Sequence, residues 1–215
     1  MLPTITPTII DMPPGGEVIL RHQTWDDYET LLQTRKDRAA IKITFSAKTQ
    51  EIRIMAPLPR HGNCSDTLSD LVKCLLRYQG LDWQGFDPIT LKRFQQKGLE
   101  PDHCFYIQNR TAILGKDRID LAIDPPPDLV LEVDLTSFTN AEDYEDIGVP
   151  ELWIYRHQAL RIYTFGDRHY QEQAESPLFP GIPVKRLIPE YVERAWKDGA
   201  SVALRAFEHQ LQQLS

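Results

Sequence analysis

Hydrophobic and polar residues follow two different periods along the N-terminal third of the chain. Between residues 41 and 45, and again between 52 and 54, apolar residues alternate with polar ones, and the segment SAKTQ separates the two runs. Alternation with a period of two predicts a β-hairpin. The segment WDDYETLLQTR has helical spacing, and Thr24 stands where an N-terminal capping residue is expected.

Further along, helical and strand patterns alternate. Pro57 and Pro59 are expected to end the second strand, and an amphipathic helix should then start at residue 63 and stop at Gly80. PPPDLVLEVDL is almost continuously apolar, which is typical of a central strand buried on both faces. Other strands are predicted around ITLKRF and HCFYIQ and over ELWIYR and ALRIYTF, with a turn at HQ. A short helix capped by Thr or Ser is predicted in TSFTNAEDYEDIG, and a helical tail broken near Gly199 over 189–214.

These elements predict a single α/β or α+β domain without internal repeats. The proline-rich residues 1–16 are expected to form an extended arm, residues 17–190 the main domain, and residues 191–215 a C-terminal helical tail. A chain of 215 residues is long enough to bury a substantial core.

Charge and cysteine content narrow the functional classes. With 24 basic and 31 acidic residues the net charge is −7, which argues against a broad basic surface for nucleic acid. Three cysteines without a CxxC motif argue against a disulfide framework and a structural zinc site, and favour reduced thiols in a cytoplasmic protein. The chain has neither an apolar run long enough to span a membrane nor a secretory signal, so no membrane partner is expected.

Four acids lie on or beside the two strands around residues 103–108 and 129–135. Asp102 and Asp128 each precede a strand, and Glu132 and Asp134 lie inside the second one. Residues i and i+2 of a strand share a face at roughly 6.6 Å, so Glu132 and Asp134 could line one pocket. Asp128 is too far along the strand to join them, whereas Asp102 could do so if the registers of the two strands match.

Buried carboxylates need a compensating charge. One interpretation is a hard divalent cation, Mg²⁺ or Mn²⁺, held by carboxylates and water. The alternative is that one of the acids pairs with an arginine such as Arg118 or Arg110, or faces solvent.

At these residues the chain resembles a known family. The blocks EPD…FYI, RID…DPPPDLVLEVDLTS and GVPELWIY, together with IRIMAPLPRHG upstream, are similar to the Uma-type restriction endonucleases of the PD-(D/E)XK nuclease superfamily. The resemblance covers about residues 20–190. It implies a restriction-endonuclease-like fold, with a mixed central sheet flanked by helices and an acidic site where two strands diverge.

The resemblance also implies site residues. Asp102 matches the first acid of the motif, Glu132 matches the (D/E) position, and the backbone carbonyl of Val133 would be a third ligand of Mg²⁺. Asp134 then occupies the position of the motif's lysine. An aspartate there repels the phosphate, whereas a lysine ammonium would attract it.

This departure leaves the lysine's role open. The helix that follows contains no lysine, and Lys116 is the nearest candidate in sequence. His61 could be a general base or ligand, although a lone histidine is more often a hydrogen-bonded structural group.

Two functions follow from these observations. The first is a Mg²⁺-dependent DNA endonuclease, impaired by the loss of the lysine, for which a homodimer would supply the two sites that cutting a duplex requires. The second is a non-catalytic binding or assembly module that retains the nuclease fold. An unrelated hydrolase has little support, since neither GxSxG nor HExxH occurs.

Overall fold

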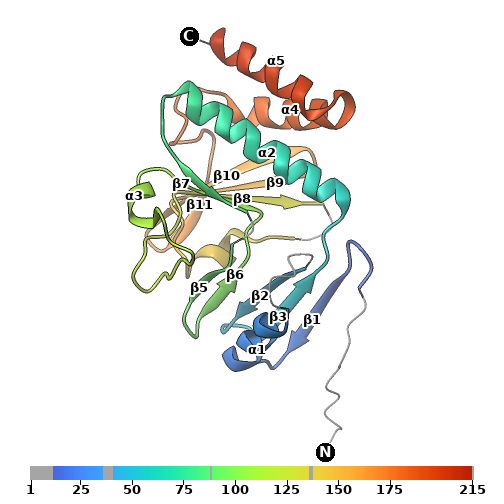
Figure 1. The fold of residues 1–215 in the computed structure, drawn as a ribbon, viewed down its shortest axis with the longest axis vertical. Helices are drawn as coiled ribbons and strands as arrows, with labels where there is room; N and C mark the ends of the chain where they lie inside the picture. The colour runs from blue at the N-terminus through green and yellow to red at the C-terminus, as the bar shows by residue number, and fades with distance from the viewer. Residues whose placement is uncertain (1–11, 36–40, 88, 136–137, 215) are drawn as a thin grey trace, which may run out of the picture.

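The computed structural model describes residues 12–35, 41–87, 89–135 and 138–214, and these residues form two β-sheets with helices packed against them (Figure 1). Most of the expected extended arm, residues 1–11, lies outside the described residues. The two sheets meet at the segment that leads from β6 into β7, because β6 belongs to the smaller sheet and β7 to the larger.

The larger sheet has six strands in the order β11-β10-β9-β8-β7-β4. Their bounds are β4 Gln84–Phe86, β7 His103–Tyr106, β8 Leu129–Asp134, β9 Glu151–Arg156, β10 Ala159–Gly166 and β11 His169–Gln173. Strands β8 and β9 are parallel and all other neighbours are antiparallel, so the sheet is mixed, as predicted. All six residues of β8 are buried, which confirms the predicted central strand.

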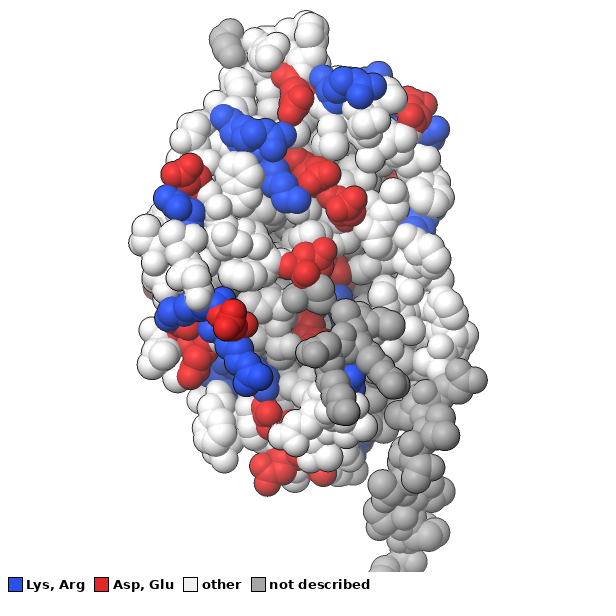
Figure 2. Space-filling model, viewed as in Figure 1, with Lys and Arg blue, Asp and Glu red and all other residues white. Residues whose placement is uncertain are grey.

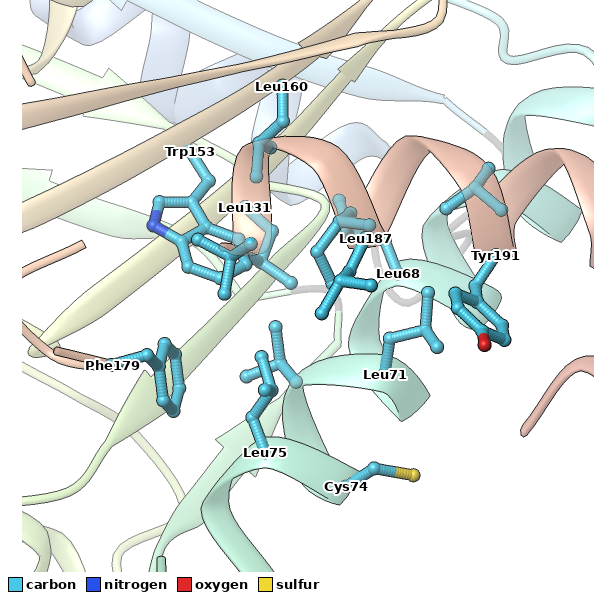
Figure 3. Packing of buried hydrophobic residues seen from close by; sticks show 14 of the residues in the cluster. Leu68, Leu71, Cys74, Leu75, Leu131, Trp153, Leu160, Phe179, Leu187 and Tyr191 are labelled. Atoms are coloured by element: carbon cyan, nitrogen blue, oxygen red, sulfur yellow. The ribbon is translucent and has the colours of Figure 1, made fainter. Parts of the chain in front are cut away.

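Helices α2 (Pro59–Tyr78) and α4 (Val184–Asp198) cover one face of this sheet, and α5 (Ala200–Gln212) packs on these two helices. Figure 3 shows Leu68 and Leu75 of α2 beside Leu131 and Trp153 of the sheet, with Leu187 of α4 completing the layer. Burial of each such side chain contributes about 1.5–3 kcal/mol, so this layer is the main hydrophobic core.

The opposite face of the larger sheet is covered by shorter elements. These are β5 (Leu91–Arg93), β6 (Lys97–Leu99), α3 (Arg110–Ile113) and the 3-10 helix η1 (Ala141–Tyr144). Val130 and Ile154 pack here together with Tyr144. Because side chains alternate along a strand, Glu132 projects to the same face as Val130.

The smaller sheet is antiparallel, in the order β1-β3-β2-β6-β5. Its first strands are β1 Glu17–Arg21, β2 Lys42–Ser46 and β3 Glu51–Met55, and helix α1 (Trp25–Arg35) covers one face. Tyr28 of α1 packs there on Phe45 and Ile52. The residues that alternate with these, Lys42 and Thr44 among them, line a pocket on the other face.

Several predicted elements are confirmed. Helix α1 starts with a reciprocal cap, in which the Thr24 backbone N–H donates to Asp27 Oδ2 (2.8 Å) and the Asp27 N–H donates to Thr24 Oγ1 (3.2 Å). The β2–β3 hairpin and the β9–β10 hairpin are present, and Gly199 separates α4 from α5 with a positive φ of 94°.

Other predictions need correction. Helix α2 begins at Pro59 rather than residue 63, because proline fits the first helical turn, where its missing N–H has no partner to lose. The short helix is the 3-10 turn η1, preceded by Asn140 with no side-chain cap, so the predicted Thr or Ser cap is wrong; residues 136–137 lie outside the described residues. Helix α4 starts at Val184, five residues before the predicted start of the helical tail at residue 189.

The prediction missed the short strands β1, β4, β6 and β11, and left α3 unassigned. Within the described part of the chain, no helix is both long and apolar enough to cross a membrane.

Candidate active site

Asp102 and Glu132 lie side by side on neighbouring strands. The antiparallel register of β7 and β8 pairs His103 with Leu131. Asp102, which precedes His103, therefore lies beside Glu132, which follows Leu131. Both side chains are buried, with 5% of Asp102 and 8% of Glu132 exposed. The strand registers therefore match, which was the condition for the two carboxylates to share a site.

Lys42, from β2 of the smaller sheet, reaches both carboxylates. Its Nζ lies 2.6 Å from Asp102 Oδ1 and 3.4 Å from Glu132 Oε2, and the lysine side chain is 15% exposed. One ammonium thus contacts acids from two strands of the other sheet.

The remaining carboxylate oxygens also have partners. The Val133 backbone N–H donates to Asp102 Oδ2 at 2.8 Å, and His61 Nε2, from the first turns of α2, lies 3.3 Å from the same oxygen. The Tyr144 hydroxyl donates a short hydrogen bond to Glu132 Oε1. Asp102 is therefore held by three groups and Glu132 by two.

These contacts separate the pKa values of the two acids. Burial raises the pKa of Asp102, but Lys42 and His61 outweigh it and hold the pKa well below its usual range. Burial dominates for Glu132 and raises its pKa to about 7, with the neighbouring Asp102 adding to the rise and Lys42 opposing it. Burial lowers the pKa of His61, yet its contact with Asp102 prevails and raises it. One acid is thus firmly ionised, and the other exchanges its proton near neutrality.

Asp134 lies apart from this group. Its carboxylate is buried and forms an ion pair with Arg156, whose Nε lies 2.9 Å from Asp134 Oδ2, while Thr139 donates its backbone N–H (2.9 Å) and its hydroxyl (2.8 Å). Asp134 is absent from the lining of the pocket, although Thr139 lines it. The residue at the motif's lysine position thus belongs to an ion pair with the adjacent strand β9.

Three other sequence candidates also lie elsewhere. Lys116 forms an ion pair with Asp124 and does not line the pocket. Asp128 accepts hydrogen bonds from the backbone N–H groups of Ile107 (2.6 Å) and Asn109 (3.2 Å), so it fixes the turn after β7. Arg110, considered above as a partner of the strand acids, contacts Asp82 instead at 3.1 Å.

The carboxylates open onto a pocket of about 130 Å³ between the two sheets. Its lining includes Asp102, Glu132 and Val133, residues of the smaller sheet, and Phe138, which is 61% exposed. On the molecular face that Figure 2 shows, basic and acidic side chains are interspersed and form no continuous basic stripe.

The donor set is compatible with Mg²⁺ or Mn²⁺. Both carboxylates contact one cation, the Lys42 ammonium, so they converge on a shared position. Among the described residues no cluster of three or more His, Cys, Asp and Glu side chains could hold a metal ion. Two carboxylates are nevertheless sufficient for Mg²⁺, which commonly binds through one or two of them and keeps several waters.

Sequence reasoning missed Lys42 and Tyr144. The polar side of the β2 pattern was visible, but nothing in residues 41–45 indicates that this side faces acids some 60 and 90 positions later. Tyr144 lies in the segment TSFTNAEDYEDIG, for which the sequence predicted only a short helix. The Lys42 contact depends on the packing of one sheet against the other, and the Tyr144 contact on the packing of η1 against β8.

The comparison with protein-family models agrees with the sequence blocks described above. The family model described as "Uma2: Putative restriction endonuclease" matches residues 25–196. A solved structure described as a putative nuclease belonging to DUF820, from Anabaena variabilis, is similar at 14% identity and a TM-score of 0.45, covering 64% of this chain and 82% of that one. No curated protein sequence matches the chain.

Proposed function

Because the chain belongs to the Uma2 family of restriction-endonuclease-like proteins, we propose that it is a Mg²⁺- or Mn²⁺-dependent DNA endonuclease that hydrolyses phosphodiester bonds at the Asp102–Glu132 pocket. The observation that supports this best is the convergence of two buried carboxylates, from neighbouring strands, on one cation position beside a pocket.

In this proposal Asp102, Glu132 and the backbone carbonyl of Val133 would hold the metal. The N–H and C=O of one strand residue face the same neighbouring strand, and the Val133 N–H already donates to Asp102, so its carbonyl opens toward the same side. A bound Mg²⁺ would polarise the scissile phosphate and lower the pKa of the attacking water.

Lys42 would supply the ammonium that the motif places two residues after its second acid. Its side chain shares the pocket with both carboxylates, whereas Asp134 is held by Arg156. A cation in the pocket would stabilise negative charge on the phosphate. Asp134 does not repel that phosphate directly, because Arg156 neutralises it.

His61 would orient Asp102, because its Nε2 lies 3.3 Å from Asp102 Oδ2. A positioning role also fits its burial, with 5% of the residue exposed.

The second candidate function is a binding or assembly module without catalysis. The observation that favours it is the Asp134–Arg156 ion pair. Asp134 stands where the motif has its lysine, and this ion pair gives it a structural role there. The net charge of −7 points in the same direction.

Calorimetric titration of Mn²⁺ combined with plasmid nicking separates the two functions. The wild-type protein should bind Mn²⁺ and nick DNA, and Glu132→Gln, which keeps the acceptor for Tyr144, should lose both activities. Glu142→Gln is the matched control, because Glu142 is exposed on the segment that carries Tyr144 and does not line the pocket. Binding without nicking would support the module, and absence of binding would refute the nuclease proposal.

A further inference from the structure

Lys42 lies where a divalent cation would have to bind. Its Nζ contacts Asp102 Oδ1 at 2.6 Å and Glu132 Oε2 at 3.4 Å, so it lies between the two oxygens proposed above as metal ligands. A metal ion that touches both oxygens also has to lie between them, at 2.0–2.1 Å for Mg²⁺. The ammonium and the ion therefore compete for one space and one pair of charges.

We propose that Lys42 is a built-in competitor of the divalent ion: its ammonium occupies the cation position in the metal-free protein, and an entering ion must displace it. This inference rests on the proposed metal site but makes a separate claim about affinity. It explains how two adjacent carboxylates remain buried in the absence of metal, since an uncompensated pair would be costly.

The fold holds the backbone of Lys42 in place but leaves its side-chain ammonium able to move. Strand β2 is paired with β3 on one side and β6 on the other, and Lys42 lies opposite Met55, so the Cα is held within the sheet. The four-carbon side chain is flexible, and the adjacent pocket of about 130 Å³ gives the ammonium room to turn away from the carboxylates.

Lys97 provides a matched comparison. It is a buried lysine, 4% exposed, that lines the same pocket as Lys42, but its ammonium pairs with Asp143 at 2.7 Å. Removing Lys97 deletes one positive charge from the pocket lining without vacating the position between Asp102 and Glu132. The two lysines therefore distinguish occupancy of the cation position from general charge in the pocket.

The test is calorimetric titration of Mn²⁺ into the full chain as wild type, Lys42→Met and Lys97→Met, without DNA. Lys42→Met should bind Mn²⁺ at least tenfold more tightly than wild type, and Lys97→Met should stay within twofold. If Lys42→Met does not fold, Lys42→Gln retains a neutral donor and should show the same tightening. Mn²⁺ should also raise the thermal midpoint of the Lys42 variant more than that of wild type at equal concentration.

The outcomes separate this inference from the nuclease proposal. Equal Mn²⁺ affinity in wild type and both Lys42 variants overturns the inference and leaves the nuclease proposal standing. Binding by a Lys42 variant but not by wild type supports the inference and counts against a metal-dependent activity of the natural protein. If no protein binds Mn²⁺, both are overturned.

Discussion

Arg156→Met tests whether Asp134 is a structural ion-pair partner or part of the reactive site. Arg156 reaches Asp134 through Nε at 2.9 Å and through a short contact from its terminal nitrogen, and its guanidinium also donates to the backbone carbonyl of Thr139 at 2.6 Å. The side chains of Arg156 and Asp134 are only 11% and 1% exposed, so water cannot take over the contacts of the deleted guanidinium.

The expected loss of stability is large for one substitution. Removing one partner of a buried ion pair typically costs about 3–5 kcal/mol. A domain of this size loses about 2–4 °C of thermal midpoint per kcal/mol, so the midpoint should fall by about 6–20 °C. Adding Asp134→Asn removes the buried negative charge and keeps an acceptor for Thr139. The double variant should therefore recover at least about half of the stability lost in Arg156→Met.

Urea unfolding followed by tryptophan fluorescence measures these differences. Arg161→Met, on the exposed side of the neighbouring strand β10, is the matched control and should leave the midpoint unchanged. The Mn²⁺ affinity of Arg156→Met should stay within twofold of wild type, because neither member of the pair contacts Asp102 or Glu132. A loss below about 1 kcal/mol would refute the buried-charge reasoning, and a large loss of Mn²⁺ affinity would place Asp134 in the site.

Three further predictions concern the rest of the fold. Gly98→Ala should destabilise the protein by about 1–3 kcal/mol in urea, because a Cβ would overlap the buried ring of Tyr28; an unchanged midpoint would mean that the ring can move aside. Thr24→Ala should cost about 1 kcal/mol by removing the cap contact with Asp27, and a loss no greater than measurement error would show that the cap is not needed. Burial raises the pKa of Cys74 to about 12, so its thiol is un-ionised at pH 8 and iodoacetamide should label it only in urea; labelling of the native protein would contradict this environment.

Long elements with a strong period were predictable from sequence because their signal is local. The buried strand β8, the hairpin β9–β10 and the amphipathic helix α2 each contain enough apolar residues to define their own period. The strands β4 and β6 have three residues each, which is too short for a period to show. These short strands form through pairing with β7 and β2, and pairing across the chain leaves no local signal.

The candidate site was predictable to the same extent. The adjacency of Asp102 and Glu132 followed from strand geometry once a matching register was assumed. The i+2 rule placed Asp134 near Glu132, but it could not identify Arg156 as the partner, because that contact depends on the parallel register that sets Asp134 beside Arg156. The contact of Lys42 with the two acids could not be predicted from sequence, because it depends on how the two sheets are arranged.

The site is divided between the two sheets, and Glu100 shows how its parts are kept together. Glu100 lies in the segment that links β6 to β7, two residues before Asp102. It accepts a bidentate pair of contacts from Arg35 at 2.6 Å each, and the backbone N–H of Ile43 at 2.8 Å.

These bonds tie the segment that carries Asp102 to α1 and to β2, the strand that carries Lys42. Glu132 is positioned instead by β8 of the larger sheet. Lys42 contacts Asp102 at 2.6 Å and Glu132 at 3.4 Å, and Asp102 is also tied to β8 by the Val133 N–H. The distance from the ammonium to Glu132 therefore depends on how the sheets pack, whereas a metal ion bound by both acids would be held by neighbouring strands of the larger sheet alone.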